Sequence, residues 1–167
     1  SVEGSLTPEI EEDSLDIPNE RIRLIFSAQD ILVQSSINAQ VLIVDDAPFN
    51  RLVLRKILMS AGYISAEAST GLEAVSMITA ACDRGSPFSV VLMDIEMPEM
   101  DGIELARHCA RVSPKTEVMF ITGFSGVALR AGQSMPQAKV LSKPFHLKDL
   151  VLEVERLFNK EAASGQL

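Results

Sequence analysis

The chain has 167 residues, enough for one domain with a packed hydrophobic core and a short additional segment. It contains no Trp and one Tyr and carries a formal net charge of −8, so neither an aromatic stacking surface nor a basic surface for nucleic acid is expected. No apolar run reaches the roughly 18 residues that span a membrane, and no secretory signal opens the chain. A cytoplasmic location is therefore expected.

The acidic charge is concentrated at the N-terminus. Residues 1–40 hold eight acids and two arginines, a net charge of −6, whereas acids and bases nearly balance in the rest of the chain. Residues 1–19 are acidic and lack a clear period, which predicts a tail or linker. Residues 20–37 have apolar positions along one side, which predicts a helix that docks on the domain or pairs weakly with a second copy. Gln29 and Ser36 interrupt this apolar stripe, so a monomer is favoured over a weak dimer.

From Gln40 onward, short apolar runs alternate with helical patterns. This alternation predicts an α/β fold with a parallel sheet and with helices on both of its faces. We assign the alternating region to residues 40–160, an acidic segment with its helix to residues 1–39, and a flexible tail to residues 161–167. The predicted strands are 41–44, 64–69, 89–93, 118–121 and 139–142. The predicted helices are 48–61, 72–83, 102–112, 127–132 and 146–158.

Polar side chains follow four of the predicted strands. Asp45 and Asp46 follow the first strand, and Asp94 follows the third. Thr122 follows the fourth strand and Lys143 the fifth. A single acid after a strand is often a helix cap, but four strand ends of this kind are hard to explain by capping. Because ligand sites of parallel α/β sheets lie beyond the carboxyl ends of the strands, these residues predict one shared site.

The residue types at this edge indicate phosphoryl chemistry. Three crowded carboxylates repel one another unless a cation lies among them, and oxygen ligands without thiolate or imidazole suit Mg²⁺. A lysine and a threonine add a positive charge and a hydroxyl donor for phosphoryl oxygens. Asp94 is then the expected nucleophile, which forms an acyl phosphate.

The motifs in combination carry a family resemblance over roughly residues 40–160. They are Asp45-Asp46 after the first strand, Asp94 in LMDIEMPEMDG, Thr122 in FITG, and Lys143 in LSKPF. The sequence resembles the receiver domain of two-component response regulators. Its second half is similar to single-domain receivers of the CpdR type, and its first half to the receivers of hybrid kinases.

The resemblance implies a flavodoxin-like (βα)₅ fold, a doubly wound parallel sheet of strand order 2-1-3-4-5. It also implies that Mg²⁺ is held by Asp46, Asp94 and the backbone carbonyl of Glu96, with Asp45 acting mainly through water.

The same resemblance implies that Asp94 takes the phosphoryl group from the phosphohistidine of a histidine kinase or a histidine phosphotransfer protein. Thr122 and Lys143 would bind the phosphoryl oxygens, and the bond from Lys143 to Pro144 would be cis. Such a receiver is not an enzyme beyond catalysing its own phosphorylation and dephosphorylation.

Two departures from the family pattern concern switching and lifetime. Val140 stands three residues before the lysine, where receivers often carry an aromatic residue that swings inward on phosphorylation. Phe124 is an alternative switching or gating residue, or simply an apolar residue that is packed or exposed. Glu96 and Phe124 occupy positions that tune the lifetime of the aspartyl phosphate in the family.

The remaining hypotheses concern how the domain passes on a signal and which function it has. Residues 159–167 leave no room for an output domain, so we expect signalling by contact with a protein target through the last helices and strand. The chain would be a stand-alone receiver or the terminal module of a hybrid histidine kinase.

The alternative function is a Mg²⁺-dependent phosphohydrolase with an aspartyl-phosphate intermediate, because Glu96 lies two residues after Asp94. The acidic pair after the first strand and the lack of a cap favour the receiver, and the intact acid, threonine and lysine set counts against a purely scaffolding role.

Overall fold

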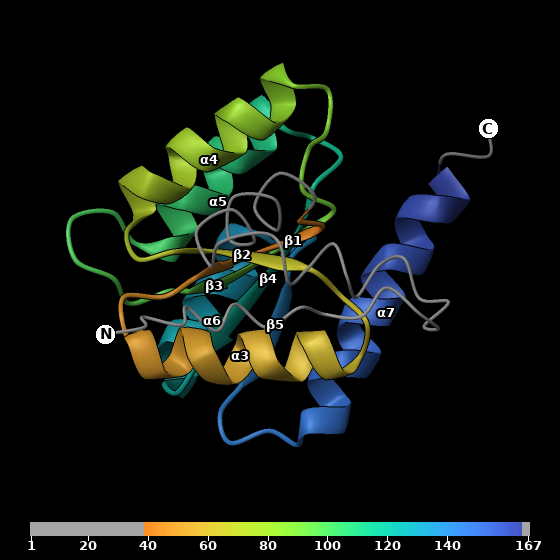
Figure 1. Cartoon of the computed structure of the whole chain (residues 1–167). Coiled ribbons are helices and arrows are strands. Elements are labelled where there is room, and N and C mark those ends of the chain that lie inside the picture. Colours follow the sequence, from red (N-terminus) through yellow and green to blue (C-terminus); the bar gives the residue numbers. More distant parts are fainter. Residues whose placement is uncertain (1–38, 165–167) are drawn as a thin grey trace, which may run out of the picture. The chain divides into compact units, whose positions relative to one another are not determined.

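The structure is a computed structural model that describes residues 39–164, with side chains described for residues 39–160 (Figure 1). The predicted tail at 1–19 and helix at 20–37 lie outside the described residues. The division of the chain at residues 39 and 160 stays a prediction.

Every strand and helix predicted between residues 40 and 160 is present. The strands are β1 (Val41–Val44), β2 (Ser65–Ala68), β3 (Val90–Asp94), β4 (Glu117–Thr122) and β5 (Lys139–Ser142). The helices are α3 (Pro48–Ser60), α4 (Gly71–Asp83), α5 (Gly102–Val112), α6 (Ser125–Ser134) and α7 (Leu147–Ser164).

The largest difference from the predicted bounds is at the end of α7, which continues past Phe158 to Ser164. The added turns hold Lys, Glu and Ala, which favour helix but do not extend the apolar stripe on which the prediction rested. Helix α6 is also longer than predicted, because the glycines at 126 and 132 are tolerated near its two ends.

The five strands form one parallel sheet in the order β2-β1-β3-β4-β5, which confirms the predicted flavodoxin-like topology. The order reverses at β1, whose neighbours are β2 and β3. Along the register, Val44 pairs with Met93, and Thr122 pairs with Ser142. The residues that follow these pairs therefore emerge along one edge of the sheet.

The two faces of the sheet are covered by different helices. Helices α4 and α5 lie over one face in Figure 1, and α3 lies on the opposite side. One core cluster joins α4, α5 and α6 to alternate strand residues such as Leu42 and Val44. The other joins α3 and α7 to Val41 and Ile43. Because β1 and the apolar part of β3 are buried on both faces, their ends are rigid supports for polar side chains.

No helix within residues 39–164 combines the length and the hydrophobicity that a membrane span requires.

Candidate functional site

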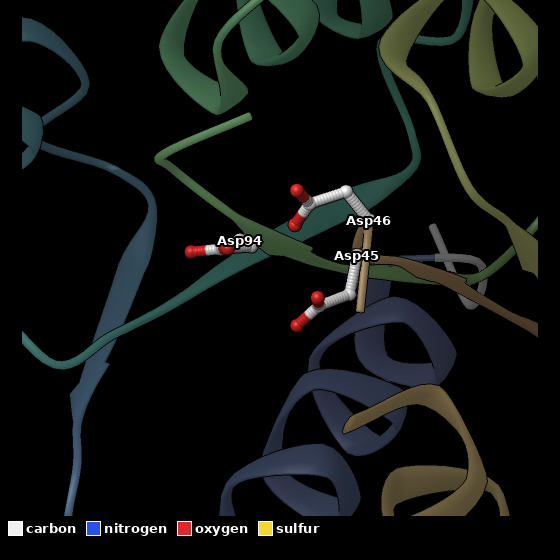
Figure 2. Close-up of side chains that lie close together, drawn as sticks. All are labelled: Asp45, Asp46 and Asp94. Atoms are coloured by element: carbon white, nitrogen blue, oxygen red, sulfur yellow. The ribbon is translucent and has the colours of Figure 1, made fainter. Parts of the chain in front are cut away.

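Three aspartates converge at the ends of β1 and β3. One carboxylate oxygen from each of Asp45, Asp46 and Asp94 lies within 4.8 Å of the others. Figure 2 shows the three side chains close together at the ends of the two strands, with Asp46 above and Asp45 below the strand end that bears Asp94. The sheet order accounts for this cluster, since β1 and β3 are hydrogen-bonded neighbours although almost fifty residues of chain separate the acids.

The two adjacent aspartates occupy different environments. Asp45 is 3% exposed, whereas Asp46 is exposed to solvent. The buried carboxylate accepts a hydrogen bond from the Ala47 amide (2.8 Å to Oδ1) and from the Asn50 side-chain amide (3.2 Å to Oδ2, 3.4 Å to Oδ1). These donors offset the cost of burying a charge. Sequence reasoning missed Asn50, although its place in the first turn of α3 puts it within reach of the residues that end β1.

Asp94 is the last residue of β3 and is partly buried. The pKa of its carboxyl group is raised to about 6, first by burial and second by the nearby charge of Asp45. The amides of Glu96 and Ile95 and the charge of Lys143 act in the opposite direction on the pKa. The Glu96 amide lies 3.4 Å from Asp94 Oδ1. The ionised form of Asp94 is therefore less favoured than in an ordinary aspartate, and added positive charge would favour it.

The other two predicted residues lie along the same edge: Thr122 is the last residue of β4, and Lys143 directly follows β5. Thr122 is 1% exposed, and its Oγ1 accepts a hydrogen bond from the Phe124 amide at 3.2 Å. The Lys143 amide donates to the Thr122 carbonyl at 2.8 Å, which ties the two segments together. The Lys143 side chain is exposed, and its charge reaches Asp94. The peptide bond between Lys143 and Pro144 is cis.

The loop after β3 is packed directly against the backbone of Asp94. The Gly102 amide donates to the Ile95 carbonyl at 2.9 Å. A Cβ atom at position 102 would stand 2.3 Å from the Asp94 carbonyl oxygen and 2.9 Å from Ile95 Cα. Glycine is therefore required here for the close approach of α5 to the strand end. Sequence reasoning treated Gly102 as the start of a helix and missed this contact, for which no local spacing gives a signal.

The three residues considered for switching or lifetime differ from one another in their exposure. Glu96 is exposed, and Phe124, which precedes the first turn of α6, is 61% exposed. Val140 on β5 is partly buried and packs against the core cluster of α4, α5 and α6.

Comparisons with known proteins agree with this geometry. The family model described as the response regulator receiver domain matches residues 41–155. The chain is 45% identical over 119 residues to the response regulator receiver protein CpdR of Brucella abortus, covering 71% of this chain and 95% of that protein. It is 33% identical over 127 residues to the sensor kinase CckA of the same organism, covering 74% of this chain but 13% of the kinase.

A solved structure, that of the chemotaxis protein CheY4 of Vibrio cholerae, superposes with a TM-score of 0.60 at 29% sequence identity. The match covers 71% of this chain and 98% of CheY4. The strand order, the acids at the ends of β1 and β3 and these matches lead to one conclusion. The chain belongs to the family of response regulator receiver domains of two-component systems.

Proposed function

We propose that Asp94 accepts a phosphoryl group from the phosphohistidine of a histidine kinase or a histidine phosphotransfer protein. Receiver domains are phosphoacceptor signalling modules and are generally not classed as enzymes. The observation that carries the proposal is the convergence of three carboxylates within 4.8 Å around the end of β3. Asp94 is the member of the cluster that stands in the motif LMDIEMPEMDG and that has the raised pKa, about 6.

The donor set fits Mg²⁺, because it consists of oxygen atoms and carries an excess of negative charge. We assign the direct ligands to Asp46, Asp94 and the backbone carbonyl of Glu96. Asp45 would act mainly through water, since its two oxygens already accept hydrogen bonds from Ala47 and Asn50. When bound, the ion supplies positive charge that offsets the repulsion among the carboxylates and the charge on the phosphoryl oxygens.

The chain's own residues then have distinct tasks. The ionised Asp94 carboxylate attacks the phosphorus atom, and the donor histidine leaves with the electrons of the broken P–N bond. Thr122 Oγ1 accepts its hydrogen bond from the Phe124 amide, so the hydroxyl proton is available to a phosphoryl oxygen. Lys143 brings an ammonium group to the same oxygens and, before transfer, favours the ionised form of Asp94.

We further propose that Phe124 takes part in the response to phosphorylation, because Val140 offers no aromatic ring to move. The Phe124 amide donates a hydrogen bond to Thr122 Oγ1, and this exposed residue directly precedes α6. A movement of Thr122 toward a phosphoryl group would therefore displace the start of α6. Glu96 is exposed beside Asp94 and is the candidate residue for tuning how long the acyl phosphate survives.

The output is assigned to contact with a protein target through β5, α6 and α7. The match to nearly the full length of CpdR supports a stand-alone receiver, and the match to a small part of CckA keeps a hybrid-kinase module as the alternative.

Labelling with acetyl phosphate, followed by intact-mass measurement, tests the proposal. We expect one phosphoryl adduct that requires Mg²⁺, persists in the control Asp83→Asn and disappears in Asp94→Asn. An undiminished adduct in Asp94→Asn would assign the chemistry to another residue. Steady turnover of p-nitrophenyl phosphate would instead favour the phosphohydrolase reading.

A further inference from the structure

Arg51, in the first turns of α3, connects the acidic cluster to the edge strand β2. Its Nη1 donates to the Asp45 backbone carbonyl at 2.8 Å, and its Nε lies 3.4 Å from Glu67 Oε1. Glu67 also binds Arg55, whose Nη1 lies 2.9 Å from Oε2. The Arg51 side chain is 17% exposed and that of Arg55 is 40% exposed. Arg51 and Arg55 thus share Glu67, and Arg51 also donates a hydrogen bond to the backbone carbonyl of Asp45.

The contact with the Asp45 carbonyl has a geometric consequence. Because a peptide unit is planar, the direction of this carbonyl fixes the plane that also contains the Asp46 amide. Fixing the plane restricts ψ of Asp45 and φ of Asp46. The guanidinium therefore limits the directions in which both carboxylates leave the end of β1.

Glu67 anchors the Arg51 guanidinium to the sheet. It lies on β2 in register with Ile43 of β1, two residues before Asp45. An arginine held at two points by a carboxylate and a carbonyl is more restrained than one that reaches a carbonyl from solvent alone. Two contacts at or below 3.4 Å therefore connect β2 to the Asp45 carbonyl, one between Glu67 and Arg51 and one between Arg51 and the carbonyl.

We propose that Arg51, anchored by Glu67, is a positioning residue for the acidic cluster and sets its affinity for Mg²⁺. This inference rests on the proposed Mg²⁺ site. Arg51 contacts a backbone oxygen of the cluster and none of its carboxylates, so its role is to orient Asp45 and Asp46 rather than to bind the ion.

Charge and geometry predict opposite effects for the loss of Arg51. A guanidinium close to the cluster repels a second cation, so its removal would strengthen Mg²⁺ binding if charge were decisive. If orientation is decisive, removal weakens binding. Partners that orient metal ligands typically change metal affinity by about 10- to 100-fold. We expect the orientation effect to exceed the charge effect, because the cluster is open to solvent at Asp46 and charges are screened there.

The test is a titration of the full chain with Mg²⁺, in which NMR monitors the amide resonances of Asp46 and Ala47. NMR is suited to the purpose because the chain has no Trp to report on the site by fluorescence. Arg51→Met should weaken Mg²⁺ binding by about tenfold, at the lower end of the range for such partners. The matched control is Arg55→Met, which also removes an ion pair with Glu67 but leaves the Asp45 carbonyl untouched. We expect its affinity to stay within twofold of the wild type.

A second readout does not depend on the ion. In Mg²⁺-free protein, the Asp46 amide resonance should move in Arg51→Met and not in Arg55→Met, because this amide shares the peptide plane that Arg51 holds. If Arg51→Met does not fold, Arg51→Lys against Arg55→Lys decides the matter, since an ammonium group cannot reproduce the fork that joins the carbonyl to Glu67.

The outcomes are distinct. Equal affinities in the Arg51 and Arg55 variants, or tighter binding in Arg51→Met, would overturn the positioning role while leaving the proposed function intact. A wild-type protein that binds no Mg²⁺ would overturn the proposed Mg²⁺ site and, with it, this inference.

Discussion

The ends of β1 and β5, which both border the candidate site, differ in burial and in hydrogen bonding. At the end of β1, Asp45 is buried, its carboxylate accepts hydrogen bonds from Ala47 and Asn50, and its carbonyl accepts one from Arg51. At the end of the edge strand β5, Lys143 is exposed, and the strand itself has no fully buried residue.

The ends of β1 and β3 form the acidic half of the site, and the end of β5 forms its basic half. The difference indicates that the two halves have different roles. Preorganised acids can hold a cation with little rearrangement. An exposed lysine on an edge strand can approach a phosphoryl group when one is present. Substitutions in one half therefore show whether the other half depends on it.

The largest expected effect is on the acidic half, from Gly102→Ala. The added Cβ would meet the Asp94 carbonyl oxygen at 2.3 Å, so the strand end or the start of α5 must move. We expect the free energy of unfolding, measured in urea, to fall by about 3 kcal/mol. Labelling of the folded protein should also slow. The control is Gly132→Ala in α6, where the new Cβ would meet no atom within 4 Å beyond its chain neighbours and the nearby backbone of its own helix. It should stabilise the protein by roughly 0.5–1 kcal/mol, and equal effects of the two changes would contradict the packing account.

The next largest effect is on the basic half, from Lys143→Ala. The loss of the ammonium group should slow labelling by acetyl phosphate about 100-fold, as for other single donors to developing negative charge. Affinity for Mg²⁺ should change less than twofold, since the acids do not depend on Lys143 for their position. Lys148→Ala is the control for a lysine in the same segment. A Lys143 variant that loses Mg²⁺ binding would show that the two halves are not separable.

The stability of the protein should depend on pH through the raised pKa of Asp94. Its pKa is about 6 in the folded protein against an ordinary value of 3.8, so between these values the native state holds a proton that the unfolded state has lost. Without Mg²⁺, stability should therefore fall as the pH rises from about 4 to about 6. Asp94→Asn removes this penalty. Because solvent screens a half-buried carboxylate, we expect a gain of roughly 1–2 kcal/mol in the free energy of unfolding at pH 7.5.

The same gain should disappear below about pH 4, where Asp94 is neutral in both states. Urea unfolding of the two proteins at several pH values measures it. A gain that is constant across this range would mean that the asparagine acts through packing rather than charge.

The smallest effect is expected from Phe124→Ala. Phe124 is 61% exposed, so stability should change by less than about 0.5 kcal/mol. The amide shifts of α6 on phosphorylation should shrink, whereas Val140→Ala should leave them in place. The reverse result would assign the response to β5.

The sequence predicts well what depends on period and topology. Apolar runs such as Val41–Val44 and the turn residues between them specify the strands, and parallel order brings Asp45, Asp94, Thr122 and Lys143 to one edge. The residue types at that edge are enough to indicate phosphoryl transfer. These features are local or follow from simple rules of connection.

The residues that position the site could not be predicted in the same way. Arg51 and Glu67 are sixteen positions apart, and their contact depends on how α3 crosses β2. The need for glycine at position 102 depends on an approach of α5 to β3 that no spacing reveals. Such contacts arise from packing, which is determined only when the whole domain is assembled.

The most direct test of the central claim is to locate the phosphoryl group. Acetyl phosphate with Mg²⁺, followed by borohydride reduction and peptide mapping, converts a phosphorylated aspartate into homoserine. We expect homoserine at position 94 and unmodified aspartate at positions 45 and 46. Homoserine at either of those two positions, or at none of the three in protein that carries the phosphoryl adduct, would contradict the claim.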